Sequence, residues 1–333
     1  MLYNDAIKQK SRKARTKNQK VKTNMKKILS LVLAALMLIG SVAALASCGD
    51  TEYDTKVKAY NNYLATVKAP TDSSLPTLTV AVSPDFAPME FVDLNKKGQD
   101  SYVGFDLLLA NYLAKEMNMQ LLVKPMSFDA CMAAVQSGSV DLGISGFSWT
   151  AERAETFLIS DYYIAGENET EQVVVTTAAK ANALTTTASY NGLKVGAQGG
   201  SLQELLVTEQ LVPAGATLVK MESINDLATA LLNGQIDALA VAKGNGEALI
   251  AANSGNLATS GFQLEVQEKY KNNVVLLNKN DTELCTSVNT ALAKALAADY
   301  YTGWYEACQV YAEVKSVDEA GFDDDGNKIT AAE

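Results

Sequence analysis

The sequence predicts an α/β protein with two lobes, each a mostly parallel sheet flanked by helices. Strand-like apolar runs alternate with helix-like segments, which is typical of parallel sheets covered on both faces. This alternation occurs twice, over 78–144 and 194–241. Two further strand-like runs, 173–177 and 274–277, bracket the second unit. We therefore expect the chain to leave the first lobe, build the second and return, with a two-strand hinge and a cleft between the lobes.

The individual elements follow from hydrophobic periodicity and from capping and turn residues. Strands are predicted over 78–82, 121–125, 140–144, 194–197, 218–221 and 236–241. Helices are predicted over 105–117, 128–136, 151–157, 202–209, 224–232, 289–297 and 304–311. The last two helices are expected to pack back on the first lobe.

The N-terminal 47 residues are predicted to lie outside the fold. Residues 25–27 begin a charged segment, 28–45 are apolar, and Leu-Ala-Ser-Cys ends the run at Cys48. This is the pattern of a secretory lipoprotein signal peptide, and the final run resembles the bacterial lipobox, whose cysteine receives an acyl lipid such as palmitate. A transmembrane anchor is the alternative. The basic residues 1–24 are either part of the signal or an extension upstream of initiation at Met25.

The remaining chain is divided by composition and by the predicted elements. We expect a polar tether over 48–75, helical in part, and an acidic tail over 313–333. The expected lobe boundaries are 76–172 for the first part of lobe 1, 173–266 for lobe 2, and 267–312 for the return to lobe 1.

Charge and residue usage exclude several classes of function. The chain has 28 Lys and Arg, 38 Asp and Glu and no His. Ten of the basic and one of the acidic residues lie in 1–47, so the chain from residue 48 carries 18 basic against 37 acidic residues, a net −19. So acidic a body argues against nucleic acid as a partner. Without histidine there is no Ser–His or Cys–His nucleophile pair and none of the commonest zinc sites.

Three cysteines lie within the predicted fold: Cys131, Cys285 and Cys308. Cys285 and Cys308 fall in adjacent predicted helices, and their spacing leaves both a disulfide and two buried thiols open.

A strand-to-helix turn at 145–153 is the main candidate for a ligand site. Thr150 is the predicted N-cap of the helix that follows, and the N–H groups at such a helix start favour an anion. Arg153 is the only arginine after residue 15. A guanidinium holds a carboxylate through two parallel hydrogen bonds. A surface ion pair with Glu152 or Glu155, worth about 0–1 kcal/mol, is the alternative.

Three motifs, at 84–91, 125–128 and 145–153, each follow a predicted strand. Ligands of open α/β sheets bind beyond the carboxyl ends of the strands, so we expect the motifs to meet at the cleft. They offer aromatic walls, hydroxyls and a charge, supplied by Phe86 and Phe128, by Ser145 and Ser148, and by Arg153.

In order along the chain, these and further motifs resemble the extracellular solute-binding proteins of family 3, the amino-acid-binding subunits of ABC importers. The motifs are Asp-Phe-Ala-Pro-Met-Glu-Phe at 85–91, Val-Gly-Phe-Asp at 103–106, Val-Asp-Leu at 140–142, Ser-Gly-Phe-Ser-Trp-Thr-Ala-Glu-Arg at 145–153, Ile-Ser-Asp-Tyr-Tyr at 159–163, Gly-Leu-Lys-Val-Gly at 192–196 and Gln-Gly-Gly-Ser at 198–201. The resemblance covers about residues 76–312. It implies a type II periplasmic-binding-protein clamshell that closes on its ligand.

The resemblance also implies site residues. Arg153 matches the family's carboxylate-binding arginine, and a lobe 2 loop matches the one whose backbone amides face that carboxylate. The matched ligand-binding positions are Phe86, Phe128, Ser145, Gly146, Ser148, Arg153, Gly199, Ser201 and Leu202, and Ala242 marks a departure. There the family usually has an aspartate that grips the ligand's α-ammonium, and some members have another at Ser83. Asp85, Glu90 or Glu247 would have to replace these acids, unless the ligand is not an ordinary α-amino acid.

The expected function is that of an extracytoplasmic substrate-binding lipoprotein of an ABC transporter. It would capture a small carboxylate-bearing solute, with an amino acid favoured, and deliver it to permease and ATPase subunits. No cofactor and no metal are expected. A clamshell enzyme of the dehydratase type and a ligand-sensing module are the alternatives, and Asp85 or Glu90 would have to act as the enzyme's acid or base.

Overall fold

The computed structural model describes residues 51–163, 170–253, 255–314 and 317–318, and all of these lie in one compact unit, Thr51–Glu333. The expected signal peptide, Cys48 and most of the expected acidic tail therefore lie outside the described residues. Within the described ranges, no helix is long and apolar enough to cross a membrane.

Lobe 1 is built on a five-stranded mixed sheet. Its strands are β1 (Thr77–Val82), β4 (Gln120–Pro125), β5 (Leu142–Gly143), β6 (Leu158–Ile159) and β12 (Leu276–Leu277), in the order β4-β1-β5-β12-β6. Strand β1 runs parallel to both β4 and β5, with Val80 opposite Val123 and Leu142. Strand β12 runs antiparallel to β5 and β6 because it arrives with the chain returning from the second lobe. The parallel part agrees with the predicted alternation of strands and helices.

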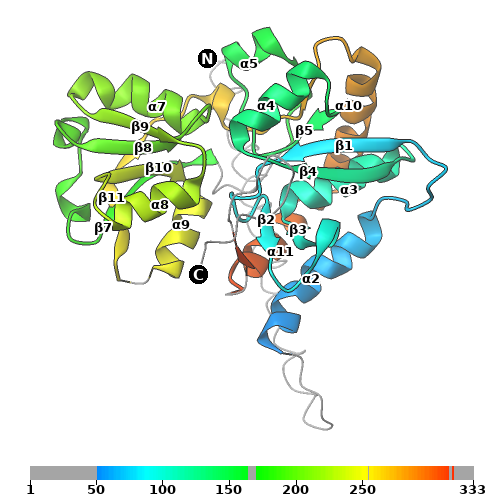
Figure 1. Ribbon diagram of the computed structural model, residues 1–333, viewed down its shortest axis with the longest axis horizontal. Helices are drawn as coiled ribbons and strands as arrows, with labels where there is room; N and C mark the ends of the chain where they lie inside the picture. The colour runs from blue at the N-terminus through cyan, green and yellow to red at the C-terminus, as the bar shows by residue number, and fades with distance from the viewer. Residues whose placement is uncertain (1–50, 164–169, 254, 315–316, 319–333) are drawn as a thin grey trace, which may run out of the picture. The chain divides into compact units, whose positions relative to one another are not determined.

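Helices cover both faces of this sheet (Figure 1). They are α2 (Glu52–Val67), α3 (Phe105–Glu116), α4 (Phe128–Ser137), α5 (Ala151–Thr156), α10 (Thr282–Ala297) and α11 (Tyr300–Ala312). On one face, α4 packs Cys131 and Val135 against Ala81 and Leu276. On the other, residues of α2, α3, α10 and α11 join one large core around the fully buried Trp304.

A small three-stranded sheet adjoins this larger core. It consists of β2 (Phe91–Asp93), β3 (Tyr102–Val103) and β13 (Val317–Asp318), and the 3-10 turn η2 (Gly98–Ser101) joins β2 to β3. The sheet is relevant to the site because the chain that leads into β2 carries the predicted motif at 84–91.

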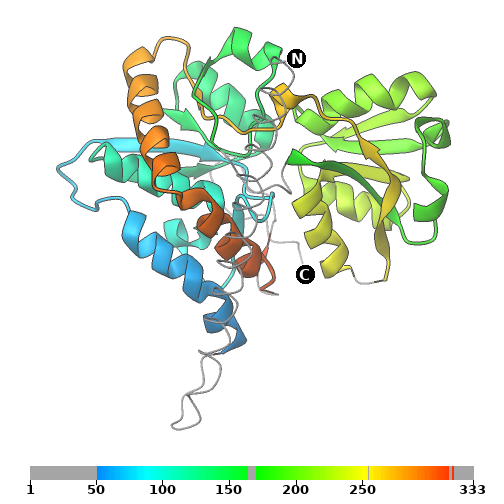
Figure 2. The same ribbon diagram turned by 180° about the vertical axis from the view of Figure 1, so that it is seen from behind.

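Lobe 2 repeats the architecture. Its strands are β7 (Gln172–Thr177), β8 (Lys194–Gln198), β9 (Thr217–Met221), β10 (Ala238–Ala242) and β11 (Leu257–Leu264), in the order β11-β7-β10-β8-β9. Helix α7 (Leu202–Gln210) covers one face, and α8 (Ile224–Leu232) and α9 (Lys243–Ala252) cover the other (Figures 1 and 2). Each face has a separate hydrophobic core. Short 3-10 turns complete the connections: η3 (Ala181–Ala183), η4 (Thr187–Tyr190), η5 (Val212–Ala214) and η6 (Glu268–Tyr270).

The sequence predicted that two strands, over 173–177 and 274–277, would cross between the lobes. In the structure neither strand spans the lobes, because each belongs to the sheet of one lobe. Strand β7 belongs to the lobe 2 sheet and β12 to the lobe 1 sheet. Just before β12, Asn273 forms isolated antiparallel bridges with both Ser148 and Tyr163, and the Tyr163 N–H donates to the Asn273 carbonyl over 2.9 Å. The two connecting segments are thus joined at a point beside the predicted ligand motif.

Helix α9 and strand β11 were not expected from the sequence. Two glycines in the first turns of α9, Gly244 and Gly246, disfavour a helix by propensity. Packing explains one of them, because a Cβ on Gly246 would meet the methyl groups of Val173 and Val175 at 3.1 and 3.2 Å. Gly246 thus lets α9 lie close on the sheet.

The expectation of a polar tether over 48–75 is wrong for most of that segment. Residues 52–67 form α2, which packs on lobe 1 with Tyr60 and Val67 only 1% and 3% exposed. Figure 2 shows α2 lying along α11. The polar residues that suggested a tether occupy the outer face of the helix, and the apolar stripe at helical spacing decides the outcome.

All three cysteines of the described fold are free and buried: Cys131, Cys285 and Cys308. Burial raises the pKa of each thiol above its usual value. Of the two arrangements left open by the sequence, the structure therefore has buried thiols.

Replacing Gly104 by alanine is expected to destabilise lobe 1. Gly104 caps α3 with φ 124° and ψ 179°, a conformation that is essentially confined to glycine, and a Cβ there would collide with the Met89 carbonyl. We expect a loss of about 3 kcal/mol or more in the free energy of unfolding, measured by urea denaturation. Gly192→Ala is the matched control. It has φ +77° but open space around it, and should lose only about 1 kcal/mol. Equal losses would show that the close approach at Gly104 is unimportant.

Candidate functional site

A pocket of about 470 Å³, including its mouth, is lined by residues of both lobes. Lobe 1 and its returning segment contribute Phe86, Glu90, Phe128, Ser145, Gly146, Ser148, Arg153 and Asn273. Lobe 2 contributes Gln172, Gln198, Ser201, Leu202, Gln203 and Ile224. The lobe 1 residues follow β1, β4 and β5, at the carboxyl ends of parallel strands, as the sequence predicted.

Most of the predicted ligand-binding residues line this pocket, but two do not. Gly199 lies beside it, donates its N–H to the Met221 carbonyl over 3.0 Å, and is shielded by the Asp129 carboxylate. Ala242 is 1% exposed at the end of β10, where it serves as the N-cap residue of α9. The methyl side chain of Ala242 carries no charge and no hydrogen-bonding group, and the residue does not line the pocket.

Arg153 is held by the start of α5. The Thr150 hydroxyl accepts from the Arg153 N–H at 3.1 Å, as expected of an N-cap. The guanidinium donates to the Ser148 carbonyl at 2.6 Å and, across the lobes, to the Gly200 carbonyl at 2.7 Å. It also lies over the Phe128 and Phe147 rings, 5.6 and 5.3 Å from their centroids.

The buried charge of Arg153 has no counter-ion among the described residues. The side chain is 5% exposed, and no carboxylate there lies within ion-pair distance of it. Burial lowers the pKa of the guanidinium to about 10, although Glu152 and Asp129 raise it. The alternative of a surface ion pair with Glu152 or Glu155 is therefore wrong. A buried cation that has neutral partners only is ready to receive an anion.

The aromatic walls and hydroxyls are also fixed by their neighbours. Phe128 packs on Phe147 with ring centroids 4.7 Å apart. Gly146 has φ +56°, and a Cβ there would meet the Phe86 ring at 2.9 Å. The Ser145 hydroxyl accepts from the Ser83 N–H at 2.9 Å and donates to Glu90 at 2.5 Å. The glycine thus lets the Phe86 ring close over the strand end.

Behind this wall, Glu90 and Asp106 form a buried pair of carboxyl groups. Asp106 accepts from the Gly146 N–H at 2.7 Å and from the Tyr163 hydroxyl at 2.9 Å. Burial raises the pKa of Asp106 to about 6. Burial and the neighbouring Asp106 raise the pKa of Glu90 well above its usual range. Glu90 Oε2 has no donor among the described residues, which fits a carboxyl group that keeps its own proton.

Asp85 joins the two lobes directly. It is 4% exposed, and one of its oxygens accepts from the Gln198 side chain and from the Ile224 N–H, each at 3.0 Å. Its other oxygen accepts from Ser83 at 2.9 Å. Burial raises the pKa of Asp85 to about 6 against the opposing effect of these hydrogen bonds. A lobe 1 carboxylate thus meets the start of α8 in lobe 2, where the helix dipole favours negative charge.

The three acids proposed as substitutes for the missing aspartate are placed very differently. Asp85 is committed to the contact between the lobes. Glu247 is exposed on α9 and lies away from the pocket. Among the described pocket residues, Glu90 is the one acidic side chain.

Several pocket residues were not singled out from the sequence. These are Gln172, Gln203, Ile224 and Asn273. Gln203 lies next to the predicted loop at 199–202, and Ile224 follows the helix cap Ser223, so both adjoin recognised features. Gln172 and Asn273 lie at the crossings, where only the register could reveal them. No group of three or more metal-binding side chains occurs within the described ranges.

The fold and the cleft define a two-lobed solute-binding protein of the type II periplasmic class. A family model, Bacterial extracellular solute-binding proteins, family 3, matches residues 78–307, and the chain belongs to this family. The relatives that the chain matches are named as solute-binding proteins.

Known relatives in this family bind amino acids. The chain is 26% identical over 268 residues to the arginine-binding extracellular protein ArtP of Bacillus subtilis, covering 80% of this chain and 92% of ArtP. Among solved structures, the substrate-binding protein AbpA of Streptococcus pneumoniae, bound to L-arginine, has 30% identity and a TM-score of 0.65, covering 72% of this chain and 97% of AbpA. An ancestral arginine-binding protein, solved with arginine and with glutamine, has 28% identity and a TM-score of 0.61. That match covers 69% of this chain and 96% of the ancestral protein.

Replacing Glu90 by glutamine is expected to flatten the pH dependence of stability. The folded pKa of Glu90 lies above its unfolded value of about 4.3. The contribution of Glu90 to the free energy of unfolding is therefore complete below about pH 4.3 and is lost as the pH rises through the folded pKa of Glu90. Urea denaturation between pH 5 and 8 should show wild type losing stability toward pH 8, and Glu90→Gln losing less.

The control for this experiment is Glu247→Gln, which changes an exposed carboxyl group on α9. It should retain the wild-type dependence on pH. An unchanged slope in Glu90→Gln would show that Glu90 does not carry the titration.

Proposed function

We propose that the protein is the extracytoplasmic substrate-binding lipoprotein of an ABC importer, and that it captures an amino acid in the cleft between its lobes. In this proposal the ligand's carboxylate lies on Arg153, with Ser148 and the lobe 2 segment at 201–202 beside it. The bound amino acid is then delivered to the permease and ATPase subunits.

The observation that carries the proposal is the buried guanidinium of Arg153, which forms no ion pair with any of the described residues. It lines a pocket to which both lobes contribute, and it already reaches the Gly200 carbonyl of lobe 2. A ligand carboxylate would compensate the charge and would contact both lobes at once, so binding and closure would be coupled.

The ligand class follows from the pocket and the relatives together. Phe86 and Phe128 supply apolar walls, whereas Gln172, Gln203 and Asn273 supply neutral polar groups. Relatives that bind arginine, and an ancestral protein solved also with glutamine, support a polar amino acid. We propose arginine, histidine and glutamine as the first ligands to test.

Membrane attachment is proposed from the sequence. The Leu-Ala-Ser-Cys run ending at Cys48 follows an apolar segment, as in lipoproteins that are cleaved and acylated at the cysteine. An acylated Cys48 would hold the protein on the outer face of the cytoplasmic membrane, beside its permease.

Removing the Arg153 side chain is expected to abolish tight binding. A thermal-shift screen of the twenty amino acids identifies the ligand, because a ligand at a hundred times its dissociation constant stabilises by about 2.7 kcal/mol. Calorimetric titration should then show Arg153→Ala losing about 3–5 kcal/mol, or two to four decades of affinity. The affinity of Arg153→Lys should lie between those of wild type and Arg153→Ala, since lysine keeps the charge but lacks the two parallel N–H donors of the guanidinium. Near-equal dissociation constants in wild type and Arg153→Ala would end the proposal that Arg153 holds the carboxylate.

Replacing Cys48 by serine is expected to prevent acylation. Detergent partitioning of cells expressing wild type should place the protein in the detergent phase, and Cys48→Ser should move it to the aqueous phase. Cys131→Ser, which changes a buried thiol, is the control and should partition as wild type does. A Cys48→Ser protein that is processed and still partitions with detergent would exclude lipid attachment at this residue.

A further inference from the structure

Helix α2 lies outside the part of the chain that matches the family model, which begins at residue 78. It starts at Glu52 and has a complete capping box. The Thr51 side chain accepts from the Asp54 N–H at 3.1 Å, and Asp54 accepts from the Thr51 N–H at 3.0 Å. These reciprocal bonds satisfy two of the free N–H groups at the start, so the helix begins immediately after Asp50.

The inner face of α2 is part of the lobe 1 core. Val57 and Tyr60 are 3% and 1% exposed, and Tyr53 and Leu64 pack against the same cluster. The Tyr60 ring meets the Tyr311 ring of α11 edge-on, with centroids 5.0 Å apart. A stripe of large apolar side chains is thus removed from water along this length, and its burial stabilises the docked helix.

A buried carboxylate joins the N-terminal half of α2 to the rest of lobe 1. Asp93 of β2 accepts from the Tyr53 hydroxyl of α2 at 2.5 Å and also from the Tyr311 hydroxyl of α11. The Asn95 backbone and side chain donate to its other oxygen at 2.9 and 3.0 Å. Three elements thus share one carboxylate, and releasing α2 would remove one of its donors.

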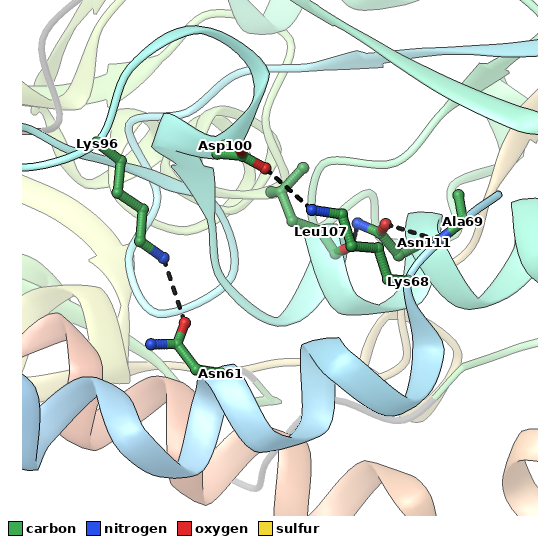
Figure 3. A network of polar contacts seen from close by, with 7 residues as sticks. All are labelled: Asn61, Lys68, Ala69, Lys96, Asp100, Leu107 and Asn111. Carbon is green, nitrogen blue, oxygen red and sulfur yellow. Dashed lines mark hydrogen bonds and ion pairs between the residues drawn. The ribbon is translucent and has the colours of Figure 1, made fainter. Parts of the chain in front are cut away.

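The C-terminal half of α2 is tied by the polar contacts in Figure 3. Lys96 donates to Asn61 at 3.3 Å, and Lys68 pairs with Asp100 at 3.4 Å. The Ala69 N–H, just past the helix end, donates to Asn111 of α3 at 3.1 Å. Outside the figure, Tyr63 lies so close to Gly303 of α11 that a Cβ there would collide with its hydroxyl. Both ends of the helix are therefore fixed on lobe 1.

We propose that α2 is a docked spacer that holds lobe 1 at short range from the lipid bilayer. The inference rests on the proposed acylation of Cys48. Three residues separate the Cα positions of Cys48 and Thr51 by at most about 10 Å, since an extended chain spans about 3.3–3.6 Å per residue. A free segment from 48 to 75 would instead reach about 95 Å. Docking of α2 removes most of that reach, so the protein stays within a small volume next to the membrane. This raises the effective concentration of the protein at its permease.

Energy transfer between lobe 1 and the membrane tests the proposal. The lipidated protein is placed in phosphatidylcholine vesicles that carry a headgroup acceptor. A donor is attached to Val310→Cys on α11, a residue 44% exposed, while the natural thiols of the described fold stay buried. A flexible Gly/Ser insertion of about twenty residues between Asp50 and Thr51 raises the extended reach from about 10 to about 80 Å without touching α2. We expect strong transfer in the parent and a marked loss in the insertion variant.

A second comparison releases the helix itself. Val57→Ser combined with Tyr60→Ser removes buried contacts of α2 and should also reduce the transfer. The matched control combines Thr55→Ser with Asn62→Ser, which are exposed on the same helix, and should behave as the parent. Amide exchange read by mass spectrometry should show α2 protected in the parent and unprotected in the release variant.

The outcomes separate the inference from the function on which it rests. The docked spacer would be overturned if energy transfer in the parent were as weak as in the insertion variant. It would also be overturned if the amides throughout α2 exchanged rapidly in the parent. If the parent is not captured by vesicles at all, acylation of Cys48 fails. Protection of α2 would then still establish docking of the helix. Ligand titration of every variant shows whether its fold is intact.

Discussion

A buried guanidinium that has no counter-ion among the described residues is the constraint on which the cleft depends. Arg153 is 5% exposed, and two backbone carbonyls and two aromatic rings surround it. Within the described ranges, its hydrogen-bond partners are neutral and no carboxylate pairs with it, and a buried charge without a pair is costly in a site of low dielectric constant. The strand-to-helix turn and the paired phenylalanines keep this charge in place.

Two acidic residues near the cleft hold structural elements together. Asp85 binds the start of α8 across the lobes, and Asp106 holds the turn at Gly146 and the hydroxyl of Tyr163. Burial keeps these carboxyl groups and Glu90 less acidic than usual. Of these three carboxyl groups, Glu90 lines the described pocket, whereas Asp85 and Asp106 do not. A cationic part of the ligand would find Glu90 as its acidic neighbour in the lining.

Much of the architecture could be predicted because local signals agreed with the global fold. The cap at Thr150, the helix 224–232 and the parallel direction of β1 and β4 all follow from residue pattern and capping. Helix α9 was missed because Gly244 and Gly246 disfavour a helix, and only tertiary packing explains Gly246. The placement of Gln172 and Asn273 could not be predicted, since it depends on how two distant crossings meet. The helical spacing within α2 was visible in the sequence, but the polar composition around it led to the interpretation of a tether, because the surface on which the helix docks belongs to distant elements.

The three buried thiols have a consequence for the maturation of the chain. Cys131, Cys285 and Cys308 are buried, and burial raises the pKa of each thiol, so little thiolate is available for exchange. A protein outside the cytoplasm meets oxidants while it folds, and disulfides are the usual response of small exported domains. Here the three cysteines of the described fold are free thiols, so no disulfide among them contributes to its stability. Reducing agents should leave its stability unchanged.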